Sequence, residues 1–207
     1  MKAEEEMLGF LTRKDNRSHV IEILRRGGAI EKHTLMQFWN DLERRVKEDT
    51  SAPISSDGPM NLILIADEDP WDYELDYIYH KLAKTDRERL DYSIFFFRGR
   101  ATVELCYGVS WQNYFKDVPP KLKRLAAVLE LAEKLEEMGF KKPRNGCPLA
   151  GWLPIYDGNR HDFLARVASG DAEPMLQEAS ANFCALVKRT RNLVISANQA
   201  IAAAIRK

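Results

Sequence analysis

Strand-like patterns are clearest in the middle of the chain. Two β-prone runs, at 92–97 and 101–108, flank an Arg-Gly-Arg turn, which is typical of a β-hairpin. The run at 62–66 is short and entirely apolar, which predicts a central strand covered on both faces. A fourth strand is predicted at 149–155, where Pro154 favours the edge of the sheet because proline lacks a backbone donor.

Apolar residues at helical spacing dominate the region before the sheet. We predict a helix at 15–26 that ends at Gly27-Gly28, since glycine tolerates the left-handed conformation that closes helices. A second helix follows, with an apolar stripe at Leu35, Phe38, Trp39, Leu42 and Val46. The polar loop at 49–60 either separates an N-terminal helical segment (1–50) from an α/β core (60–207) or lies within one single domain.

Three further helices are predicted in and after the sheet region. They span 70–83, 119–138 and about 174–205, and Gly139 followed by Phe140 fits a C-terminal cap of the second. The last one is long and alanine-rich, and its apolar side either packs on the core or pairs with another chain. The predicted fold is α+β: a small, mainly antiparallel sheet with packing helices, a helical N-terminal segment and a long C-terminal helix.

Composition narrows the class of protein. The 207 residues have zero formal net charge, which excludes a globally basic nucleic-acid binder but leaves room for a local basic patch. There is neither a long apolar span nor a secretory signal, so we expect no membrane contact and a cytoplasmic location. The three cysteines are widely spaced and form no Cys-x-x-Cys pair, which predicts no zinc ribbon and no disulfide framework. They are Cys106, Cys147 and Cys184.

Acidic residues after the run at 62–66 form a candidate metal site. Asp67 and Asp69 offer carboxylate oxygens to Mg²⁺ or Mn²⁺, and Glu104 on a neighbouring strand would complete the set. The structural alternative is that Asp69 caps a helix that begins at Pro70. A nuclease of the PD-(D/E)xK type would also need a lysine where Cys106 stands. We therefore expect no cofactor unless this metal-dependent nuclease or phosphodiesterase hypothesis holds.

Arginines and aromatics lie close in sequence around the hairpin and after it. Exposed side chains of these types suit nucleic-acid stacking or a protein interface. The alternative is that the aromatics belong to the core and the arginines are solvated. The candidate binding surface is Arg98, Arg100, Trp111, Tyr114 and Arg124.

The N-terminal helices suggest a third function. A glycine turn at Gly27-Gly28 between two helices resembles a helix-turn-helix over 17–47, the element of many DNA-binding regulators. The second helix has as many acidic as basic residues near its exposed face, which weakens the case for a recognition helix.

Four short segments resemble an uncharacterised accessory domain that accompanies bacterial restriction and phage-defence proteins. They lie at 35–42, 101–107, 114–115 and 151–154. The resemblance implies a bacterial, cytoplasmic α/β module and transfers no active-site residue. Our leading hypothesis is a non-catalytic binding or regulatory protein, linked to defence against foreign DNA. It would bind a protein partner or a second copy through the C-terminal helix, with nucleic acid as a further candidate partner.

Overall fold

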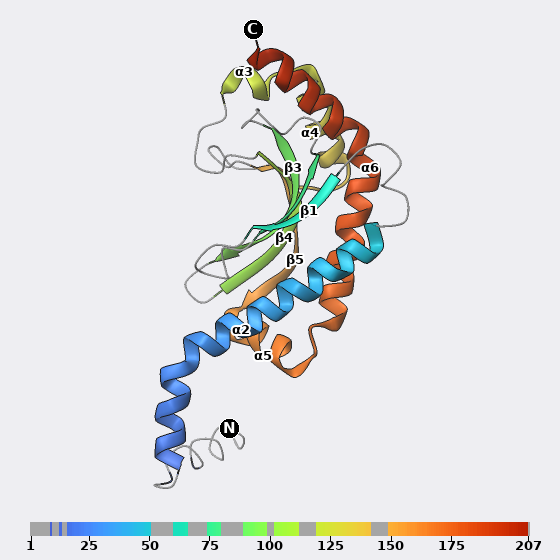
Figure 1. Cartoon of the computed structure of the whole chain (residues 1–207). Helices are drawn as coiled ribbons and strands as arrows, with labels where there is room; N and C mark the ends of the chain where they lie inside the picture. Colours follow the sequence, from blue (N-terminus) through green and yellow to red (C-terminus); the bar gives the residue numbers. More distant parts are fainter. Residues whose placement is uncertain are drawn as a thin grey trace.

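A five-stranded antiparallel sheet forms the centre of the protein, and Figure 1 shows it in a computed structural model of the chain. The strands lie in the order β1-β2-β3-β4-β5, so each strand pairs with the next along the chain. Long helices pack on one face of this sheet, and the fold class is α+β, as predicted. The structure describes residues 9, 13, 16–50, 60–65, 74–79, 89–98, 102–111, 119–141 and 149–206.

The strands and helices have the following bounds. The strands are β1 Met60–Ile65, β2 Glu74–Tyr79, β3 Leu90–Arg98, β4 Thr102–Trp111 and β5 Leu149–Asn159. The helices are α2 Arg17–Thr50, α3 Pro120–Lys123, α4 Ala126–Glu137, α5 Arg160–Ser169 and α6 Glu173–Ile205.

All four predicted strands form, but the central position predicted for the first of them is wrong. The hairpin forms as β3 and β4, and β5 with Pro154 lies at an edge of the sheet. β1 lies at the opposite edge and not in the centre, because it pairs with β2 alone. An apolar run reflects burial of both faces, but it does not reveal how many strands pair with its backbone.

The helix predicted at 70–83 is also wrong, since residues 74–79 form β2. The apolar residues Leu75 and Ile78 fit helical spacing, but Leu75, Tyr77 and Tyr79 equally fit the two-residue period of a strand. A segment this short satisfies both periods, and pairing with β1 and β3 decides between them.

The predicted helix break at Gly27-Gly28 does not occur, because α2 runs without interruption from Arg17 to Thr50. Among the described residues, only Gly139 and Gly170 have a positive φ angle. A glycine inside a helix costs about 1 kcal/mol relative to alanine, which a long helix tolerates. The turn that a helix-turn-helix over 17–47 requires is therefore missing from α2.

The region after the hairpin follows the prediction in outline. The helix predicted at 119–138 is divided into α3 and α4, and Gly139 closes α4 with φ 85°. The amide of Phe140 donates to the carbonyl of Leu135 at 2.9 Å, and the Phe140 side chain is buried, which confirms the predicted cap.

β5 extends to Asn159, beyond the end of the strand predicted at 149–155. α5 begins directly after it and was not predicted. The Asn159 side chain accepts a hydrogen bond from the His161 amide at 2.7 Å and thereby caps α5.

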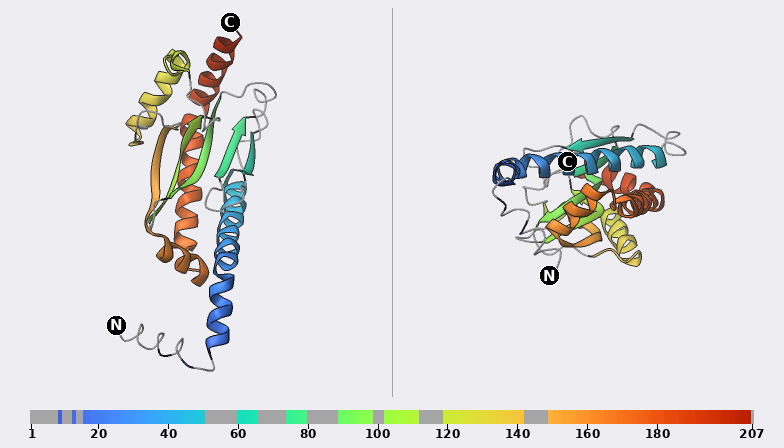
Figure 2. Two further views of the ribbon diagram at one scale, coloured as in Figure 1. Left: turned by 90° about the vertical axis from the view of Figure 1, so that its left-hand side faces the viewer. Right: turned by 90° about the horizontal axis from the view of Figure 1, so that it is seen from below.

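One hydrophobic core lies between the sheet and the helices. α2, α4, α5 and α6 all contribute to it, and Figure 2 shows α6 behind the sheet in its left panel. Aromatic rings from three elements meet in this core: Phe96 lies 5.3 Å from Trp39 and 5.2 Å from Phe163, centroid to centroid. The stripe predicted for the second helix is buried at every position: Leu35, Phe38, Trp39, Leu42 and Val46.

The apolar side of α6 packs on this core. Its predicted stripe is buried except at Ile205, which is partly exposed. The side on which the self-association hypothesis rested is therefore covered by the chain itself. None of the described helices is long and apolar enough to cross a membrane. The buried stripe comprises Phe183, Val187, Val194, Ala197 and Ile201.

Buried polar side chains fix α6 against β3. The Asn198 amide group accepts from the Leu90 backbone amide and donates to the Leu90 carbonyl, each at 2.8 Å. The hydroxyls of Tyr92 and Thr190 lie 3.0 Å apart. These bonds satisfy polar groups inside the core and set the position of the helix along the strand.

Candidate functional site

The hairpin and β5 have a second face that points away from α6. Side chains alternate along a strand, so the residues between the core positions of β3 and β4 lie on this face. The left panel of Figure 2 views the sheet from this side, with α6 behind it. One group of residues here, which we call the Trp152 patch, combines aromatic and charged groups: Phe97, Glu104, Lys141, Trp152 and Asp157.

Aromatic rings form the apolar part of the Trp152 patch. The Phe97 ring lies 5.2 Å from the Trp152 ring and 5.0 Å from the Phe95 ring, both in edge-to-face geometry. Phe95 and Cys106 beneath them are buried, whereas Phe97 is 37% exposed. A large ring thus remains in solvent on top of a small apolar cluster that holds it in place.

Lys141 adds a cation to the aromatic rings. Its ammonium group lies 4.5 Å from the centre of the Trp152 ring and 3.9 Å from a carboxylate oxygen of Glu104. Backbone hydrogen bonds position Lys141: its amide donates to the Trp152 carbonyl at 2.9 Å, and the Trp152 amide donates back at 3.4 Å. The lysine therefore reaches the patch by pairing with the outer edge of β5.

Two carboxylates face each other across neighbouring strands of the patch. Glu104 on β4 and Asp157 on β5 are direct register partners. Partial burial is the main cause that raises the pKa of Glu104; Lys141 opposes this shift and Asp157 adds to it. Burial is also the main cause that raises the pKa of the Cys106 thiol far above its usual range, and the same two carboxylates add to this shift. Among the described side chains beside the aromatic rings, the carboxylates therefore outnumber the one lysine.

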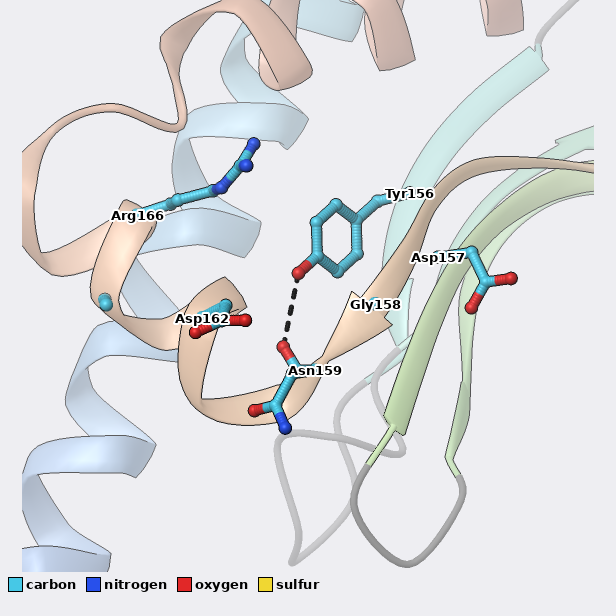
Figure 3. A pocket seen from close by; sticks show the side chains of 7 residues that line it. Tyr156, Asp157, Gly158, Asn159, Asp162 and Arg166 are labelled. Atoms are coloured by element: carbon cyan, nitrogen blue, oxygen red, sulfur yellow. Dashed lines mark hydrogen bonds between the residues drawn. The ribbon is translucent and has the colours of Figure 1, made fainter.

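A cavity of about 520 Å³ lies on the other side of β5, where the strand leads into α5 (Figure 3). The Tyr156 ring points toward α5 in this view, and its hydroxyl donates to the Asn159 carbonyl at 3.2 Å. The Arg166 guanidinium lies 5.8 Å from the centre of the ring. Asp157 points away from this ring in the same view. The cavity is lined by Tyr156, Asp157, Gly158, Asn159, Asp162, Ala165 and Arg166.

Only two side chains of the predicted arginine–aromatic surface lie among the described residues, and they differ in exposure. Trp111 is only 3% exposed and belongs to the core, because its position on β4 faces the helices. Arg124 is exposed where α3 ends. Arg98 ends β3, but its side chain, Arg100 and Tyr114 lie outside the described residues.

The predicted metal site remains a prediction, because Asp67 and Asp69 lie outside the described residues. β1 ends at Ile65, and β2 and β3 separate it from the strand of Glu104. At a strand spacing of about 4.8 Å, this arrangement places β1 roughly 14 Å from β4. Within the described part of the chain, no three His, Cys, Asp or Glu side chains gather as a metal-binding group.

Sequence reasoning included Glu104 among its candidates but missed the other groups around it. Lys141 and Trp152 are both distant from Glu104 along the chain, and neither belongs to a recognisable motif. Asp157 lies beyond the end of the strand predicted at 149–155. Only the pairing of β4 with β5 brings these residues together.

The chain matches no protein-family model, and comparisons with curated proteins and with solved structures give no match either. The resemblance to an accessory domain of defence proteins therefore stays a prediction.

Proposed function

We propose that the protein is a non-catalytic binding protein that recognises a protein partner through the Trp152 patch. The observation that carries this proposal is the exposed Phe97 ring, which packs edge-on against Trp152 on the sheet face opposite α6. Aromatic side chains on a rigid surface, surrounded by charged groups, are typical of interface hot spots. In the setting that the resemblance implies, this partner belongs to a bacterial defence system in the cytoplasm.

The electrostatics of the patch disfavour nucleophilic chemistry at Cys106. A nucleophilic cysteine needs a lowered pKa so that the thiolate forms near neutral pH. At Cys106 the shift is in the opposite direction, because burial and the nearby carboxylates disfavour the negative charge. The thiol is therefore kept protonated and serves as a small core residue beneath Phe97 and Trp152.

Purification of the protein from its own source cells, followed by native mass spectrometry, tests the proposal. The variants are Phe97→Asp, which puts a charge on the patch, and Leu129→Asp as the matched control. Leu129 is a large apolar residue that is 48% exposed on α4, away from the sheet.

We expect a bound protein with the wild type and with Leu129→Asp, and its loss with Phe97→Asp. Titration of the recovered partner should then show at least tenfold weaker binding to Phe97→Asp, since loss of a hot spot costs about 2 kcal/mol or more. Equal binding to all three forms, or no partner at all, would contradict the proposal.

A further inference from the structure

We propose that the Trp152 patch binds a basic side chain of the partner, an arginine guanidinium, between the carboxylates of Glu104 and Asp157 and the ring of Trp152. This inference rests on the proposed function and specifies the chemistry of the partner. Three features support it. Lys141 already places a cation in the patch, and the carboxylates of Glu104 and Asp157 outnumber this cation. Phe97 offers an apolar contact to the partner residue next to the arginine.

The first feature is Lys141, which shows that this position holds a cation. Its ammonium group is within reach of both an aromatic face and a carboxylate, at 4.5 Å and 3.9 Å. This combination is the usual environment of a bound organic cation in proteins. The Lys141 side chain is 54% exposed, so its contacts are weak and an incoming cation can replace it at low cost.

The second feature is the charge balance. Glu104 and Asp157 are opposite each other on adjacent strands, where like charges destabilise the sheet. Lys141 lies next to Glu104, whereas Asp157 is exposed. Among the described side chains, two carboxylates close to one lysine leave a net negative charge, which a guanidinium from the partner would neutralise. Its planar fork also matches carboxylate oxygens and stacks on an indole ring better than an ammonium does.

The third feature is Phe97, the register partner of Glu104 on its other side. The order across the sheet is therefore aromatic ring, carboxylate, carboxylate, from β3 to β5. A segment that crosses these strands would place an apolar residue on Phe97 while its arginine reaches the carboxylates. The ligand class is thus a peptide segment with an arginine beside an apolar residue.

Nuclear magnetic resonance on the full chain tests this assignment without the natural partner. The signal is the indole N–H of Trp152, assigned with Trp152→Phe, and the probe is N-acetyl-arginine amide. The matched control ligand is N-acetyl-citrulline amide, which has nearly the same shape but no charge. We expect a saturable shift in the millimolar range with the arginine probe and no saturable shift with the citrulline probe.

Two variants distinguish recognition of the arginine probe by the patch from a purely structural role of Lys141. Lys141→Met removes the competing cation and should tighten arginine binding about twofold to fivefold, the range expected for an exposed charge contact. Glu104→Gln should weaken it by a similar factor. A structural lysine would give the opposite result, because its loss would loosen the patch.

The inference is overturned if the two probes cause the same shift or if Lys141→Met weakens arginine binding or leaves it unchanged. These outcomes are distinct from failure of the proposed function. Partner binding that depends on Phe97 without arginine binding would contradict this inference alone. Arginine binding without a Phe97-dependent partner would contradict only the proposed function.

Discussion

The two faces of the β3–β4 hairpin have different chemistry although they share the same backbone. Toward the helices, Ile94, Val103 and Leu105 are apolar and completely buried. Toward the other side, Asp91 and Ser93 are equally buried but polar. Alternate residues of one strand thus enter two environments. On the side that faces the helices, apolar contacts stabilise the fold, whereas the other side holds polar and charged groups.

The polar face itself is divided into two parts. At one end, the Nε of Arg89 lies 2.9 and 3.0 Å from the two carboxylate oxygens of Asp91, and the hydroxyls of Ser93 and Ser110 are 2.6 Å apart. At the other end lies the Trp152 patch, where Phe97 is exposed. Buried polar groups are tolerated at the first end because they satisfy one another. At the second end, Lys141 and Asp157 are exposed, so their charged groups are accessible from solvent.

Substitutions on the apolar face of the hairpin are expected to cause the largest loss of folding stability. Leu105→Ala should lower the free energy of unfolding by about 4 kcal/mol, because it leaves a cavity in a well-packed core. Phe97→Ala on the neighbouring strand should cost about 1 kcal/mol or less, since much of that ring is in solvent. Urea unfolding of the two variants provides the measurement. Similar losses from both would show that the two faces contribute equally to stability.

Breaking the buried ion pair between Arg89 and Asp91 is expected to cause a somewhat smaller loss of folding stability. Asp91→Ala should cost about 3 kcal/mol, because it leaves the buried charge of Arg89 without its partner. The double variant Arg89→Leu with Asp91→Leu should recover most of this loss, since buried ion pairs and apolar pairs of similar volume are often close in free energy. Chemical denaturation of the single and double variants tests this. A single variant that unfolds like the wild type would contradict it.

The smallest effect concerns pH and the Trp152 patch. The raised pKa of Glu104 means that the folded chain binds this proton more tightly than the unfolded chain. The stabilisation by this group is therefore fully present below its ordinary pKa and is lost as the pH rises through the raised value. Glu104→Gln, which mimics the protonated form, should raise Tm by about 1–2 °C at pH 7 and leave it unchanged at pH 4.

Glu133→Gln is the control for this measurement, because Glu133 is exposed on α4. It should leave the pH dependence of Tm unchanged. A Tm of Glu104→Gln that is lower than that of the wild type at pH 7 would show that the ion pair with Lys141 outweighs burial and the repulsion by Asp157.

Local sequence was sufficient to predict the elements that depend only on residues close to one another along the chain. β3 and β4 consist of β-prone residues that flank Gly99 in the sequence, α6 has a long apolar stripe, and Gly139 with Phe140 closes α4. Each of these features depends on residues that are neighbours along the chain. Backbone preferences and side-chain periodicity were therefore sufficient to predict them.

Tertiary structure decided the rest. Residues 74–79 fit two periods, and only pairing with β1 and β3 made them a strand. Gly27-Gly28 permits a break but does not impose one, so α2 continues through it. The Trp152 patch combines residues that are far apart in sequence, and its charges meet because β4 pairs with β5 in one register. The proximity of such residues depends on how whole strands and helices are arranged. No local pattern of residues encodes that arrangement.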